Sequence, residues 1–117
     1  MPYSTDGKNA MLDALGALAV YASLHDGDPG DTGANEISGG SPAYARKAIT
    51  WNAADSGSMD DSNAPVFDVP AGGSVQYVGL WSAETSGTFY GSDQVTTEDF
   101  TGQGTYTLTD MDLDLNS

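Results

Sequence analysis

The chain has 117 residues, no cysteine and a formal net charge of −14, because seventeen acidic side chains face only three Lys and Arg. This length suits one domain, expected over residues 1–117, and the missing cysteines exclude disulfides, thiol nucleophiles and thiolate metal sites. A surface this acidic repels nucleic acid and anionic membranes, so neither is expected as a partner.

Two explanations of the acidity compete. In one, the protein is adapted to high salt, where the Debye length falls to about 3 Å at 1 M and self-repulsion stops mattering. In the other, the carboxylates bind calcium, whose preferred ligands they are. The acidic residues are scattered over the whole chain and lysine is nearly absent, which favours the halophilic explanation.

The N-terminal segment is predicted to form an amphipathic helix over residues 8–18, preceded by helix N-cap candidates at residues 4–6. Its apolar residues form one stripe at positions i, i+1, i+4 and i+7, namely Met11, Leu12, Leu15 and Leu18. A signal peptide is not expected, because Asp6 offsets Lys8 and Asp13 adjoins the apolar run. No stretch approaches the ~20 apolar residues of a membrane span.

The rest of the chain is predicted to form strands at 20–25, 43–52, 66–69, 74–83, 88–92 and 105–115, separated by polar loops at 26–42, 53–65 and 93–104. On the first strand, Ser23 and His25 share one face. On the last, Met111 and Leu113 should face inward, whereas Leu108 should face outward with Asp110, Asp112 and Asp114. Because no helices alternate with the strands, a parallel sheet is excluded. We predict a mainly β fold, an antiparallel β-sandwich of jelly-roll-like form with one short N-terminal helix.

Catalytic chemistry has little support in the sequence. His25 is the only histidine, and a Ser–His–Asp machine would need it as the base, with Ser23 two residues away. No G-x-S-x-G elbow is present, so we expect His25 to be a surface residue at a strand end. Any acid-rich chain offers pairs of carboxylates, so counting acids does not test for glycosidase chemistry, and the sequence shows no deep-cleft signature in its favour. The glycines at 27, 30 and 33 do not follow the G-x-G-x-x-G pattern of a phosphate-binding loop.

A structural cation is the one cofactor that the sequence offers a candidate for. Asp26, Asp28 and Asp31 crowd one loop, but an EF-hand is excluded because Gly30 occupies loop position 5 and Asp31 position 6. A calcium site of another type therefore stays open at these three residues. Further candidates are the acids at 60–61 and the alternating acids at 110–114, although the latter lie about 6.5–7 Å apart along a strand.

Residues 23–51 read SLHDGDPGDTGANEISGGSPAYARKAITW, and this segment resembles one that recurs in small tail-associated proteins of tailed viruses, often described as tail fibre or minor tail proteins. The helix at 8–18 and the stretch at 79–90 fit the resemblance as well. The residues of the segment that match are Ser23, Leu24, His25, Asp28, Pro29, Gly30, Thr32, Gly33, Asn35, Glu36, Ile37, Ser38, Gly39, Gly40, Tyr44 and Arg46.

This resemblance implies a non-enzymatic structural component of the virion, built on a β-rich domain, whose partners are copies of itself and other virion proteins. It does not decide between tail and capsid. The additional acids Asp26, Asp31, Asp60 and Asp61 suggest a virus of a salt-loving host, a haloarchaeon.

The matched segment is predicted to hold its own loop in shape rather than to react. Short polar side chains beside glycines commonly bond backbone groups and brace irregular loops, and Arg46 should make a charge-assisted bond to Glu36 or Asp28. The expected brace and contact residues are His25, Asp28, Thr32, Asn35, Glu36, Tyr44 and Arg46. Two alternatives remain: a module that binds host-surface glycan through an exposed Trp51 or Trp81, and a small hydrolase that uses His25 or a pair of carboxylates.

Overall fold

The computed structural model of the protein describes residues 3–109 and 111–115. It contains one helix, α1 (Thr5–Leu18), and antiparallel strands, so the predicted mainly β fold is confirmed. The strands are β1 (Tyr21–His25), β2 (Lys47–Ala48), β3 (Ser58–Asp60), β4 (Val66–Val69), β5 (Ser74–Trp81), β6 (Phe89–Asp99), β7 (Gly104–Thr107) and β8 (Asp112–Asp114). Asp110 lies outside the described residues.

The central layer is a four-stranded sheet in the order β2-β1-β5-β6. β1 pairs with β5 along its whole length, from Tyr21 opposite Trp81 to His25 opposite Tyr77. On its other side β1 pairs with the short strand β2. This arrangement places β1 inside the sheet and leaves β2 and β6 at its two edges.

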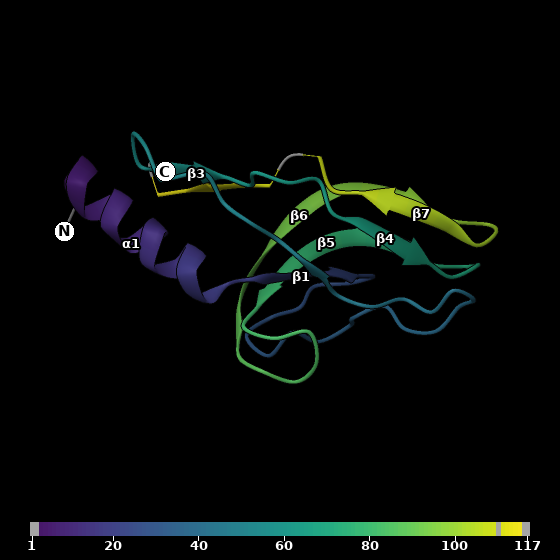
Figure 1. Cartoon of the computed structure of the whole chain (residues 1–117). Helices are drawn as coiled ribbons and strands as arrows, with labels where there is room; N and C mark the ends of the chain where they lie inside the picture. Colours follow the sequence, from purple (N-terminus) through teal and green to yellow (C-terminus); the bar gives the residue numbers. More distant parts are fainter. Residues whose placement is uncertain (1–2, 110, 116–117) are drawn as a thin grey trace.

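One long antiparallel hairpin contains all the strands from β3 to β8. β5 and β6 lie next to its turn, and β4 and β7 continue the pairing beyond Ser74 and Asp99 in the same register. In β3–β8 the register is shifted by one residue. The hairpin bends where the Gly72 N–H donates to the Phe100 carbonyl (2.7 Å) and the Phe100 N–H to that of Gly73 (2.8 Å). The β4–β7 half thereby folds over the four-stranded sheet in a sandwich-like arrangement (Figure 1).

The hydrophobic core fills the space between these two layers. Leu24 and Val78 contribute from the sheet, and Phe67 and Val69 from β4, and all four are fully buried. Burying side chains of this size stabilises a fold by about 1.5–3 kcal/mol each. The core therefore holds the folded hairpin closed against β1.

Helix α1 begins three residues earlier than predicted, after Ser4, whose hydroxyl accepts the Gly7 N–H (3.0 Å). The single-stripe prediction is wrong in part: Leu12 is buried, but Met11 and Leu18 are exposed. The physical reason is that α1 packs on β3 and the loop before it rather than on a broad sheet, so only a narrow face is covered. Within the described residues, no helix combines the length and apolar character needed to cross a membrane.

Several predicted strand limits are wrong. Of residues 43–52 only Lys47–Ala48 pairs as a strand, and the predicted loop at 53–65 contains β3. The strand predicted at 88–92 continues to Asp99 because β5 is long enough to pair with it. The loop predicted at 93–104 is thereby reduced to the bend at 100–103.

The strand predicted at 105–115 is divided into β7 and β8. The chain bends between them with the hairpin, so the alternation of faces restarts. Leu108 is therefore buried, at 2% exposure, contrary to the prediction, whereas Met111 is buried as expected.

Candidate functional site beneath the glycine-rich loop

The loop at 26–42 folds back onto the end of β1. The Ile37 N–H donates to the Leu24 carbonyl and the Asp26 N–H to that of Asn35, both at 3.0 Å. His25 and Glu36 form an isolated antiparallel bridge between these two bonds. The loop thus continues the sheet edge beyond β2 and places Glu36 beside His25.

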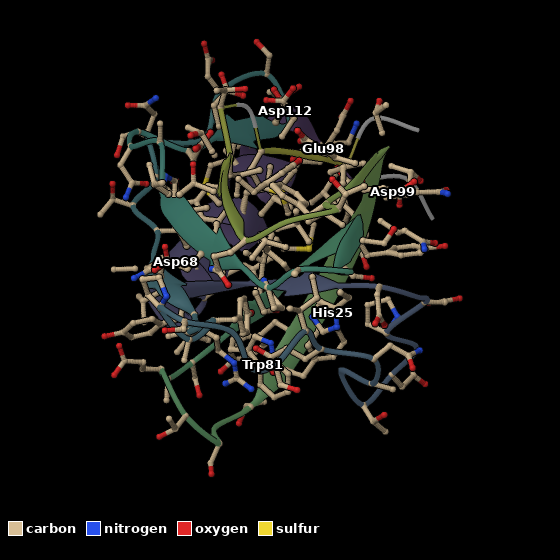
Figure 2. All side chains as sticks on the ribbon, turned by 90° about the vertical axis from the view of Figure 1, so that its right-hand side faces the viewer. His25, Asp68, Trp81, Glu98, Asp99 and Asp112 are labelled. Atoms are coloured by element: carbon tan, nitrogen blue, oxygen red, sulfur yellow. The ribbon has the colours of Figure 1, made fainter. Side chains whose placement is uncertain are left out.

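His25 lies fully buried in a chain of side-chain hydrogen bonds. Its Nδ1 is 2.8 Å from the Ala34 carbonyl oxygen, and its Nε2 is 2.7 Å from Ser23 Oγ. The Trp81 indole N–H donates to the same Ser23 oxygen (2.9 Å), and Figure 2 shows His25 and Trp81 in the interior with the labelled acids towards the outside. The prediction of a surface histidine is wrong, because the returning loop covers this face of β1.

The partners of His25 determine its tautomer. A carbonyl oxygen only accepts, so Nδ1 carries the proton, and the neutral ring must then accept at Nε2 from the Ser23 hydroxyl. Burial lowers the pKa of His25 below its ordinary value of 6.5, and the Ala34 carbonyl and the Glu36 carboxylate only partly oppose this. The result is a directed chain from Trp81 through Ser23 to His25 and Ala34.

Arg46 connects three segments of the chain. Its Nε and Nη2 donate to the two carboxylate oxygens of Glu36 at 3.0 and 2.9 Å. Its Nη1 donates to the carbonyls of Ala83 (3.1 Å) and Ser86 (2.8 Å) in the turn between β5 and β6. The guanidinium also lies 3.6 Å above the centroid of the Trp81 ring. Charge-assisted bidentate pairing and cation–π stacking are both strengthened by burial, and Arg46 is only 9% exposed.

Tyr44 ties the same cluster to the core. Its hydroxyl donates to Glu36 Oε2 (2.8 Å) and accepts the Leu24 N–H (2.9 Å). Its ring stacks on Phe67 at a centroid distance of 6.4 Å. Burial raises the pKa of Tyr44 far above its ordinary value, so the hydroxyl stays protonated as a donor to Glu36.

Two glycines allow the loop and the strands to approach this cluster closely. Gly33 has a φ of 79°, and a Cβ there would lie 2.6 Å from Trp81 Cη2. A Cβ at Gly79 would collide with the Ser23 hydroxyl and lie 2.7 Å from His25 Nε2. Both positions therefore require glycine for space, and Gly33 also for its backbone conformation.

The predicted brace residues fall into two groups. His25, Glu36, Tyr44 and Arg46 meet in the buried cluster. Within the loop itself, Asp28 Oδ1 accepts the Gly30 N–H (2.9 Å) and the Asn35 amide donates to the Asp28 carbonyl (3.0 Å).

Arg46 bonds to Glu36, one of the two partners expected for it. One detail differs from the expectation: the exposed Thr32 takes no part in the hydrogen bonds of the brace among the described residues. Trp81 and the carbonyls of the β5–β6 turn were not anticipated. The sequence signals for Trp81 were its position on the predicted strand at 74–83 and its place in the stretch at 79–90 that fits the family resemblance.

The structure gives no support to the predicted cation site at Asp26, Asp28 and Asp31. Among the described residues, no group of three or more His, Cys, Asp or Glu could hold a metal ion. The reason is local: Asp28 caps its own turn at Gly30, and the side chains of Asp26 and Asp31 are exposed to solvent.

The Ser23–His25 pair has the spacing of a nucleophile and its base, but both side chains have 0% exposure. The Ser23 oxygen is also occupied by the Trp81 N–H. A substrate would have to displace Trp81 and Arg46 to reach the hydroxyl. The hydrogen bonds of this arrangement satisfy buried polar groups, and a polar group that is buried without a hydrogen-bond partner destabilises the fold.

Replacing Arg46 by Lys should destabilise the fold by about 2–4 kcal/mol, because an ammonium cannot bind both Glu36 oxygens, reach the turn carbonyls and stack on Trp81 together. Urea unfolding followed by tryptophan fluorescence measures the loss. The neighbouring Lys47→Arg substitution also preserves charge and should stay within about 0.5 kcal/mol of the wild type. An equal effect of the two substitutions would contradict the role given to Arg46.

His25 should make stability depend on pH. Below pH 6.5 the unfolded chain takes up a proton at His25 that the folded chain does not, so stability falls as the pH decreases. Relative to a His25→Asn variant, the wild type should lose up to about 1.4 kcal/mol per pH unit in this range. The comparison cancels the titration of the carboxylates, which both proteins share. A difference between the two proteins that stays constant from about pH 8 to pH 5.5 would show that His25 is not held neutral.

Comparison with known proteins identifies the family of the chain. A protein-family model described as Podophage GP4 fiber I protein gp80 matches residues 4–114. No curated protein sequence and no solved structure matches the chain. The family match includes the helix, the glycine-rich loop and the folded hairpin, and it confirms the resemblance to tail-fibre proteins of tailed viruses. The chain therefore belongs to the family described as Podophage GP4 fiber I protein gp80 and is a structural protein of the virion.

Proposed function

We propose that this chain is a non-enzymatic, homo-oligomeric subunit of the viral tail fibre, in contact with copies of itself and with other virion proteins. Membership of a phage fibre family supports a place in the tail rather than on the capsid. Nucleic acid and membrane surfaces are not proposed as partners, since the net charge of −14 repels both.

One observation supports the proposal that the chain is not an enzyme: the reactive groups of the buried cluster around Arg46 form their hydrogen bonds within the chain. The single histidine, the serine beside it and the Arg46–Glu36 pair all bond to groups of the same chain. Groups that are satisfied and covered hold a conformation and leave no acid, base or nucleophile for a substrate.

A glycan-binding module has less support. Trp81 lies beneath Arg46 and is 8% exposed, and the Trp51 indole N–H donates to the Ala19 carbonyl (2.9 Å). A groove of about 460 Å³ does lie over Glu36, Tyr44 and Arg46. However, the polar groups beneath this groove already bond within the protein, because the Tyr44 hydroxyl makes two hydrogen bonds and Arg46 donates four.

Virus particles carrying His25→Asn test the proposal. Particle assembly and infectivity should be retained, whereas removal of a catalytic acid or base costs about 10²–10⁴ in rate. The amount of the variant in purified particles controls for folding, and immunogold labelling locates it. Full incorporation together with a loss of infectivity of that size, or labelling confined to the capsid, would contradict the proposal.

We also propose that the acidity reflects a salt-loving host, which the sequence suggested to be a haloarchaeon. Seventeen acids with three Lys and Arg repel one another when unscreened. The melting temperature should therefore be clearly higher in about 3 M KCl than in about 0.1 M KCl. Equal melting temperatures would count against this proposal, and rescue at low salt by millimolar Ca²⁺ alone would indicate specific cation sites instead.

A further inference from the structure

Exposed apolar side chains gather at one end of the molecule. Of the six large hydrophobic residues that are exposed among those described, four lie on α1 or next to its ends: Tyr3 (54%), Met11 (37%), Leu18 (53%) and Val20 (36%). The molecule is elongated, 46 Å in its longest dimension, and α1 lies at one end of it (Figure 1). Concentrated exposure of this kind is typical of an interaction surface.

α1 exposes apolar side chains in addition to Leu12, which it buries. Two of its polar side chains bond within the fold, since Asn9 accepts the Gly57 N–H (2.9 Å) and Asp13 accepts the Ala54 N–H (2.8 Å). The outward residues Ala10, Met11, Ala14, Ala17 and Leu18 are all exposed and form an apolar strip, and the exposed Asp6 and Asp13 lie along one side of it. A surface helix normally places its charged residues on the outside and its apolar residues inward.

The spacing of the outward residues fits packing against another helix. Met11, Ala14 and Leu18 follow one another at steps of three and four, the a/d pattern of a helix–helix seam. Ala10 and Ala17 flank this seam, and their small side chains let a second helix approach closely.

Charge indicates what covers this face. α1 contains only Asp6, Lys8 and Asp13 as charged residues, a net charge of −1, so two copies that meet on the apolar strip bring few of the chain's acids together. The open edge of β6 is different, because it carries Asp93, Glu98 and Asp99. Its pairing with β5 is also interrupted by a bulge, where residues 95–97 lie opposite Gln76 alone. Charges and bulges on an edge strand prevent pairing with other chains.

We propose that copies of this chain associate through α1, with Met11, Ala14 and Leu18 at the contact. This inference rests on the homo-oligomeric part of the proposed function and names its interface. A helix of fourteen residues is about 21 Å long, so the contact is small. It should be weak in dilute solution and become effective where the virion holds copies close together.

Analytical ultracentrifugation of the whole chain in about 3 M KCl tests the interface, because salt of this strength screens the repulsion between copies. The wild type should self-associate as its concentration rises. Leu18→Glu should raise the dissociation constant at least tenfold, which corresponds to about 1.4 kcal/mol. Val66→Glu is the matched control: Val66 is 50% exposed and lies on β4, so it should change the constant by less than about threefold.

Both variants should melt at the wild-type temperature, because neither side chain is buried. If Leu18→Glu does not fold, Met11→Glu replaces it. A wild type that stays monomeric up to about 1 mM, or equal effects of Leu18→Glu and Val66→Glu, would overturn the proposal.

A second measurement uses the absence of native cysteine. Ala14→Cys lies at the middle of the seam and should form a disulfide-linked dimer on mild oxidation, and Val66→Cys should not. The reverse result would overturn the interface. Because these experiments use purified protein, a monomer that is nevertheless present in the tail fibre would refute the interface alone. Self-association of a protein that is absent from the fibre would refute only the proposed location.

Discussion

The fold around the glycine-rich loop depends on how one buried cation is neutralised. Arg46 is nearly covered, and an unpaired guanidinium in that position would cost several kcal/mol. Glu36, the carbonyls of Ala83 and Ser86, and the Trp81 ring together remove this cost. They belong to segments 10 to 40 residues from Arg46 along the chain, so satisfying the charge also fixes the loop and the β5–β6 turn relative to the sheet.

The remaining polar groups of the cluster follow from this placement. Once Trp81 lies under Arg46, its indole N–H reaches Ser23, and the Ser23 hydroxyl reaches His25. Gly33 then has to lack a side chain, because the loop passes directly over the Trp81 ring. A buried polar network in which each member has a partner favours a single conformation, and holding one shape is the property that a structural subunit needs.

Local sequence signals predicted the parts of the fold that local chemistry determines. Residues 66–69 were predicted as a strand with the observed limits because Pro70 and two glycines follow. The bond between Arg46 and Glu36 was also predicted, with Asp28 as the alternative partner, because the chain has only three Lys and Arg residues. What failed depends on distant partners. β3 pairs with β8 more than fifty residues away, the split of residues 105–115 follows the bend of the whole hairpin, and His25 is buried only because the loop returns over it. No pattern within a short window contains that information.

The hydrogen bonds between the loop at 26–42 and β1 make the loop part of the rigid core rather than an adaptable binding loop. Hydrogen–deuterium exchange of single amides tests this rigidity directly at the Ile37 N–H, which bonds to Leu24, and the Asp26 N–H, which bonds to Asn35. Both amides should exchange only through global unfolding, with the same free energy as the amides of β5 around the fully buried Val78. Exchange at Ile37 and Asp26 through local opening, while Val78 stays protected, would contradict this expectation.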